Sequence, residues 1–81
     1  MKTYMVIEHL GDNADAVYAR FHARGRMLPD GLEYIDSWLT ADRRTCFQLM
    51  ACARPDLFAV WTGRWRDLVR FEIHPIGDKP D

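Results

Sequence analysis

Residues that could bind or transform a small molecule recur at alternate positions of extended, apolar stretches. The set combines carboxylates, an amide, a thiol and aromatic rings: Glu8, Tyr34, Asp36, Trp38, Cys46, Gln48 and Glu72. A partly buried carboxylate beside a second one has a raised pKa and can act as a general acid or base. A neighbouring amide can stabilise a developing oxyanion, and flat aromatic side chains can wall a planar ligand. The pattern therefore predicts a ligand site, with Glu8 and Glu72 as the candidate catalytic residues.

The same two glutamates have a structural and a metal-binding alternative. As structural groups they would form ion pairs at a subunit interface with arginines, namely Arg24, Arg26 or Arg70. Arg24 and Arg26 could also reach a carboxylate ligand, for which the guanidinium fork is suited. As metal ligands, Glu72 and His74 stand two residues apart on one strand face, and Glu8 could be a third. Two adjacent ligands are a weak pattern, so we expect no metal and no cofactor.

The two cysteines, Cys46 and Cys52, fall on one predicted strand. Six residues of extended chain separate them by roughly 20 Å, whereas a disulfide needs Cα atoms within about 7 Å. They cannot pair within one chain. We expect two small buried thiols, and the alternative is a redox or catalytic thiol.

The elements that must position these residues follow from apolar periodicity and turn signals. Strands are predicted at 3–9, 32–39, 44–52 and 69–76. Asp12 or Asn13 caps a first helix that ends before Pro29, and Pro55 begins a second helix. The order β-α-β-β-α-β predicts a four-stranded antiparallel sheet with both helices on one face. This α+β arrangement is ferredoxin-like.

Side-chain alternation divides each strand into two faces. The nearly all-apolar set is expected to meet the helices, with Ser37 as its polar exception: Met5, Ile7, Ile35, Leu39, Phe47, Leu49, Val69, Phe71 and Ile73. The opposite, mixed set holds every candidate site residue. A hairpin centred on Asp42 keeps these sets intact if it forms three cross-strand pairs: Trp38 with Cys46, Asp36 with Gln48 and Tyr34 with Met50. The mixed face is too apolar to stay exposed, which predicts a homodimer whose two sheets enclose the site.

Length and charge limit the remaining classes. The 81 residues make one domain, with an ordered core at about 3–76 and a polar tail at 77–81. The net charge is −1 and the arginines are scattered among acidic residues, which argues against a nucleic-acid partner. No apolar run reaches the roughly 18 residues of a membrane span, and the first residues do not resemble a signal peptide. We therefore expect a cytoplasmic protein without a membrane partner.

Several uncommon strings occur in an order that resembles the domain-of-unknown-function family DUF3303. They are YMVIE, RGRMLPDGL, YIDSW, CFQLM, a tryptophan pair W-x3-W, then DL and FEI, from about residue 4 to 76. The resemblance implies a small dimeric α+β barrel protein and no settled activity. Arg54 departs from the family pattern, where an acidic helix cap is expected, and so does His74, where an aliphatic residue is expected.

The expected function is that of a homodimeric small-molecule-binding domain with a pocket between the sheets. By analogy of fold, it would perform cofactor-free acid-base or monooxygenase-like chemistry. The alternative is a non-catalytic regulatory module, as in ACT-like domains, with structural ion pairs at the interface. An RNA-binding role is disfavoured because the third strand lacks the spaced aromatic residues that stack bases. Whether the protein is an enzyme stays open on the sequence.

Overall fold

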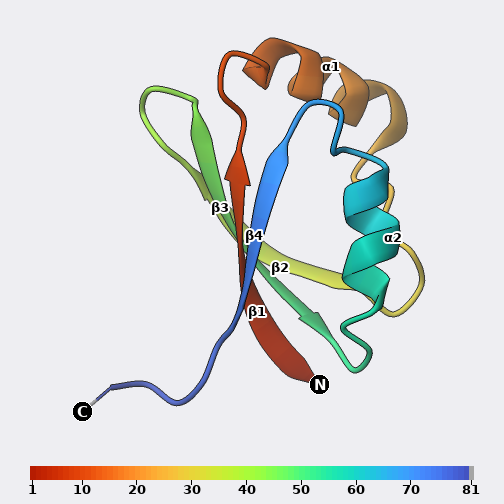
Figure 1. The fold of residues 1–81 in the computed structure, drawn as a ribbon, viewed down its shortest axis with the longest axis vertical. Helices are drawn as coiled ribbons and strands as arrows, with labels where there is room; N and C mark the ends of the chain where they lie inside the picture. Colours follow the sequence, from red (N-terminus) through yellow and green to blue (C-terminus); the bar gives the residue numbers. More distant parts are fainter. Residues whose placement is uncertain (81) are drawn as a thin grey trace.

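The computed structural model describes residues 1–80, which form four strands and two helices. Their bounds are β1 Lys2–His9, α1 Ala14–Arg24, β2 Glu33–Leu39, β3 Thr45–Cys52, α2 Leu57–Gly63 and β4 Arg70–Pro75. The sheet order is β2-β3-β1-β4, and every neighbouring pair is antiparallel (Figure 1). This is the ferredoxin-like arrangement that the sequence predicts. No helix of the described residues is long and apolar enough to cross a membrane.

The first turn of each helix differs from the prediction in one detail. Asn13 is the N-cap residue of α1, but its side chain makes no capping hydrogen bond. Its amide instead donates to the carbonyl oxygen of Leu68 at 3.0 Å. The second helix begins at Leu57 rather than at Pro55, because Pro55 and Asp56 form the turn that precedes it.

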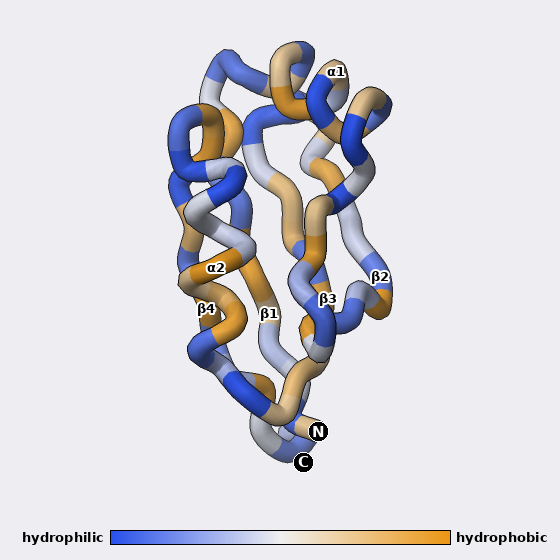
Figure 2. The backbone as a smooth tube through the Cα atoms, turned by 90° about the vertical axis from the view of Figure 1, so that its right-hand side faces the viewer, coloured by the Kyte–Doolittle hydropathy of each residue, from blue (hydrophilic) through white to orange (hydrophobic). Residues whose placement is uncertain are grey.

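Both helices cover one face of the sheet, as Figure 2 also shows from the side. The core between them joins strand residues to the second helix and its following turn: Tyr4, Val6, Leu32, Met50, Cys52, Phe58, Trp61 and Trp65. We call this the covered face of the sheet and the opposite side the open face. Cys46 and Cys52 are buried and unpaired, as predicted for structural thiols.

The predicted assignment of faces is wrong for β1 and β3. Val6 and Met50 are fully buried on the covered face, whereas Phe47 is 37% exposed. The residues that alternate with the core set, Met5, Ile7, Phe47 and Leu49, therefore lie on the open face. Packing decides which set meets the helices: Tyr4, Val6 and Met50 join Phe58, Trp61 and Trp65 in one buried cluster. For β4 the prediction is correct, because Phe71 and Ile73 pack on the core.

A β-bulge at Ile35 changes the register of the hairpin. Tyr34 pairs with Met50 as predicted, but the next pairs are Asp36 with Leu49, Ser37 with Gln48 and Trp38 with Phe47. The predicted pairs of Asp36 with Gln48 and of Trp38 with Cys46 are therefore wrong by one residue. The extra residue in β2 turns everything after it to the other side. Asp36 and Trp38 consequently lie on the open face, opposite to Tyr34.

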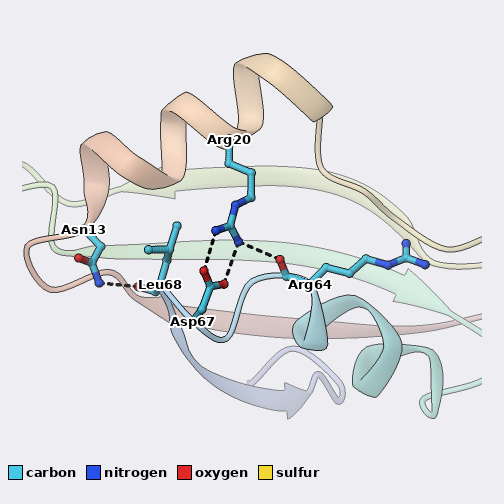
Figure 3. Close-up of polar contacts among 5 residues, drawn as sticks. All are labelled: Asn13, Arg20, Arg64, Asp67 and Leu68. Atoms are coloured by element: carbon cyan, nitrogen blue, oxygen red, sulfur yellow. Dashed lines mark hydrogen bonds and ion pairs between the residues drawn. The ribbon is translucent and has the colours of Figure 1, made fainter.

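A polar clamp ties α1 to the segment that connects α2 to β4 (Figure 3). The guanidinium of Arg20 forms two parallel hydrogen bonds to the carboxylate of Asp67, at 2.8 and 2.6 Å. Arg20 also donates to the carbonyl oxygen of Arg64 at 3.0 Å. This bidentate geometry fixes orientation as well as distance, so it holds the helix layer against the start of β4.

Candidate functional site

A cavity of about 90 Å³ lies between the covered face of the sheet and the helices. Its walls are mainly aromatic and aliphatic, and the polar groups among them come from β1, β2, β3, α1 and the loop after α1. The polar lining residues are Glu8, Tyr18, Arg26, Ser37, Cys46 and Gln48. Apolar walls with a few converging polar groups are the usual composition of a small-molecule site.

Strand pairing brings Glu8, Cys46 and Gln48 together. Glu8 lies directly opposite Cys46, and Gln48 is two residues further along the same strand. Gln48 is 5% exposed, and its amide nitrogen has the sulfur of Met50 as a partner at 3.3 Å. A thioether is a weak acceptor. The Gln48 amide is therefore a buried hydrogen-bonding group that a better partner could engage.

Burial controls the protonation of this cluster. Loss of hydration raises the pKa of Glu8 to about 7, although a hydrogen bond from the Cys46 thiol and the charge of Arg26 both lower it. Loss of hydration, together with the negative charge of Glu8, raises the pKa of Cys46 to about 12. The thiol stays protonated at neutral pH. It therefore acts as a hydrogen-bond donor to Glu8, which argues against a catalytic thiolate.

Arg26 is held at the cavity by contacts on both its side chain and its backbone. Its guanidinium carbon lies 3.6 Å from the ring centre of Tyr34 and 5.0 Å from that of Phe21. Its carbonyl oxygen accepts hydrogen bonds from the indole nitrogens of Trp61 and Trp65, each at 3.0 Å. The tryptophan pair is buried in the core and also fixes this loop.

The structure brings together only part of the predicted site. Glu8, Cys46 and Gln48 line the cavity, and Tyr34 stacks against Arg26 beside it. Asp36 and Trp38 lie on the open face because of the bulge. The predicted space between two sheets is therefore not where the cluster lies: it lies inside a single chain.

Glu72 is the second candidate catalytic residue, and it does not reach the cavity. Ile7 pairs with Glu72, whereas Glu8 pairs with Phe71, so the two glutamates lie on opposite faces. The carboxylate of Glu72 bonds the ring of His9 and lies 3.5 Å from the ring of His74. The hydrogen bond with His9 lowers the pKa of Glu72. The predicted proximity of Glu8 and Glu72 is wrong, and the partner of Glu72 is a histidine rather than an arginine.

The residues considered as alternative metal ligands, Glu8, Glu72 and His74, lie on two different faces of the sheet because of the same pairing. Within residues 1–80, no group of three or more histidine, cysteine or acidic side chains is arranged to hold a metal ion.

Tyr18 and Ser37 were not foreseen as lining residues. Tyr18 could have been found from its place on the apolar stripe of α1. Burial raises the pKa of its hydroxyl. The sequence places Ser37 in the set that meets the helices, which is correct, but its position opposite Gln48 depends on the bulge.

A larger groove of about 910 Å³ lies outside the covered cavity, around the end of β1 and the start of β4. Several of its polar side chains already have partners in the chain. Asp67 is paired with Arg20, Arg44 with Asp12, and His9 with Glu72. The smaller cavity is therefore the better candidate, because its polar groups converge on one enclosed space.

Comparisons with curated proteins and with solved structures find no match. A family model described as a domain of unknown function matches residues 2–81. The chain therefore belongs to the DUF3303 family.

Proposed function

We propose that the protein binds a small organic molecule in the cavity between its sheet and helices, and that Glu8 exchanges a proton with this molecule. One observation carries the proposal: a carboxyl group with a pKa of about 7 faces an aromatic cavity. A general acid or base is most effective when its pKa lies near the working pH. Groups with strongly shifted pKa values also concentrate at functional sites.

The polar neighbours of Glu8 suit this chemistry. When Glu8 takes a proton from a bound molecule, negative charge develops on that molecule. The amide of Gln48 and the guanidinium of Arg26 lie in the same cavity lining, and both can stabilise such charge. No further group is required for a proton transfer of this kind, so the proposed chemistry needs no cofactor.

A ligand screen with a carboxyl probe tests the proposal. We would label glutamate side chains with ¹³C, follow the carboxyl signal of Glu8 by NMR from pH 4 to 9, and add fragments of a few non-hydrogen atoms. Titration of Glu8 near pH 7 and a shift on addition of a fragment are expected. The control is Glu33→Gln, because Glu33 is an exposed glutamate on β2. A Glu8 pKa near 4.5 with no fragment bound would overturn the proposal.

A test of turnover distinguishes an enzyme from a non-catalytic binding module. A bound fragment that exchanges its acidic hydrogen for deuterium faster with the wild type than with Glu8→Gln supports an enzyme. A fragment that binds equally to both proteins and returns unchanged supports the regulatory, non-catalytic alternative. Both readouts use the same cavity and the same labelled sample.

We further propose that two copies of the chain pair through the open face. This face carries Met5, Ile7, Phe47 and Leu49, and Trp38 beside them is 52% exposed. A contiguous apolar surface of this kind is uncommon on a monomer. A two-fold axis along the strands would place Asp36 of β2 opposite His74 of β4, because Asp36, Leu49, Met5 and His74 stand at one level across the sheet, which supports a second copy as the occupant. A cytoplasmic location stays a prediction.

A further inference from the structure

We infer that the ligand of the cavity is a small monocarboxylic acid, whose carboxylate binds the guanidinium of Arg26 and whose apolar part lies among the aromatic rings. This inference rests on the proposed function and names the chemical class of its ligand. It follows from the unused donors of Arg26, from the anchoring of its loop, from the position of Glu8 and from the size of the cavity.

The guanidinium of Arg26 is charged and acts on Glu8 across the cavity, but in the part of the chain that the structure describes it lies at ion-pair distance from no carboxylate. Among residues 1–80 it forms neither an ion pair nor a hydrogen bond, in contrast to Arg20, Arg44 and Arg54, which each bind an aspartate. Its guanidinium carbon lies over the rings of Tyr34 and Phe21. Ring stacking leaves the N–H groups at the edge of the guanidinium free, and that edge is the one that binds a carboxylate in a fork.

The loop that carries Arg26 is fixed before any ligand arrives. Two indole N–H groups bond the carbonyl oxygen of Arg26, and a guanidinium nitrogen of Arg64 bonds that of Met27 at 2.6 Å. Met27 itself has a φ of 58°, which is unfavourable for a residue with a side chain. Strained backbone that its surroundings hold in place is common at ligand sites, where it positions a binding group in advance.

The protonated form of Glu8 explains why the cavity favours a carboxylate over a neutral molecule. The titratable or charged groups that face it are Cys46 from β3, Tyr18 from α1 and Arg26 from the loop. When Glu8 is protonated, Arg26 is the only charge at the cavity within the described residues, so the site favours an anion. Glu8 in that form can donate its proton in a hydrogen bond to the second oxygen of the ligand carboxylate.

The cavity limits the rest of the ligand. Its volume of about 90 Å³ corresponds to roughly three water molecules, and it is smaller than a cavity of about 150 Å³ that binds benzene. A carboxylate with one to three further carbons is therefore the expected size. Phe21, Trp61, Trp65 and Phe71 would contact those carbons.

A matched ligand series tests the inference without any mutation. Acetate, propionate, butyrate and benzoate are titrated into the full-length chain at pH 6 and pH 8, beside propionamide and propylamine, with binding followed by calorimetry and by NMR. Propionate should bind at least tenfold more tightly than propionamide. Its affinity should fall about tenfold for each pH unit above 7, because a charged Glu8 must take up a proton to accept the anion.

Two variants extend the test. Arg26→Leu should remove propionate binding while keeping the fold, because the backbone of Arg26 and not its side chain bonds the indoles. Arg24→Leu is the matched control, an exposed arginine at the end of α1, and should bind as the wild type does. Glu8→Gln should still bind propionate, since an amide can donate, but without the loss above pH 7.

The outcomes separate this inference from the proposed function. Equal binding of propionate and propionamide, or unchanged propionate binding by Arg26→Leu, would overturn the carboxylate assignment and leave the cavity as a site for neutral molecules. Tight binding of propylamine would overturn it as well. If no acid, amide or amine shifts any signal from a cavity residue, the proposed function itself is wrong.

Discussion

Each face of the sheet holds some side chains that are more usual on the other face. The covered face, which meets the helices, holds a glutamate, a glutamine and a thiol among aromatic rings. The open face presents methionine, isoleucine, phenylalanine, leucine and tryptophan, with its charged groups mainly on β4. Folding of one chain alone would favour the opposite arrangement, because polar groups lose hydration when they are buried. The difference indicates that each face serves something beyond the fold of a single chain.

The covered face shows this most directly. An apolar residue in place of Glu8 would avoid the cost of hiding a carboxyl group from water. Places where a sequence departs from what stability requires are commonly functional. The open face also departs from what the stability of a single chain requires, because its apolar side chains gain nothing from contact with water.

The largest effect is expected from a charge on the covered face. Met50 is fully buried beside Gln48, so Met50→Asp should cost about 4 kcal/mol or more of unfolding free energy. That is a large share of the roughly 5 to 10 kcal/mol that stabilises a small domain. Circular dichroism should show an unfolded or barely folded chain. A cooperative melt near that of the wild type would mean that the covered face has been assigned wrongly.

The same charge on the open face should leave the chain folded. Phe47 is 37% exposed, so Phe47→Asp should change the stability of the monomer by less than about 1 kcal/mol while preventing the pairing of two copies. Sedimentation at micromolar concentration should give a dimer for the wild type and a monomer for the variant. Ala41→Asp in the exposed hairpin turn is the control and should stay dimeric. A wild-type monomer would refute the proposed pairing.

A smaller, pH-dependent effect is expected at Glu8. Its pKa is raised from 4.5 to about 7 on folding, so the folded chain binds this proton more tightly than the unfolded chain does. Glu8 therefore lowers stability as the pH rises from about 4.5 to 7, and the loss is complete above 7. Glu8→Gln should equal the wild type near pH 4.5 and exceed it by about 3 kcal/mol at pH 8.

Thermal melting across this pH range measures the difference, with the exposed Glu33→Gln as the matched variant. That variant should follow the wild type at every pH. If Glu8→Gln is less stable than the wild type at pH 8, the carboxylate stabilises the folded chain and its pKa is not raised.

The smallest effect concerns the clamp at the edge of the helix layer. Arg20→Lys keeps the charge but loses one of the two parallel hydrogen bonds to Asp67. Because the pair is exposed, the melting temperature should fall only slightly, and high salt should reduce the difference. A fall as large as that of Met50→Asp would show that the clamp, and not the packed core, holds the helices on the covered face.

The sequence predicts the fold well because its signals are local. The periodic apolar residues of α1, the proline and glycine turns and the β-branched strands each indicate one element, and the element order leaves one simple topology. Cys46, Gln48 and Glu8 were also expected to lie together, since antiparallel pairing of β1 and β3 requires it. These inferences need only the chain order and the strand directions.

The faces and the register could not be obtained in this way. Alternation shows that two sets of side chains point in opposite directions, but not which set meets the helices, and here both sets are largely apolar. The bulge at Ile35 adds one residue to β2, and no glycine or proline in this strand indicates its position. It moved Asp36 and Trp38 away from the cavity and Ser37 toward it. Non-local packing decides both features, so the sequence assigned Glu8, Cys46 and Gln48 to the face opposite to the one that they occupy.

The three tryptophans are divided between the two faces, so their fluorescence can report on each face separately. Trp61 and Trp65 are 2% and 5% exposed and line the cavity, while Trp38 is 52% exposed on the open face. Buried indoles emit at shorter wavelengths than hydrated ones. A ligand in the cavity would thus perturb the blue part of the emission, and pairing of two chains would shift the red part. A single fluorescence spectrum of the unlabelled protein could follow both events separately, with Trp38→Phe isolating the signal of the cavity.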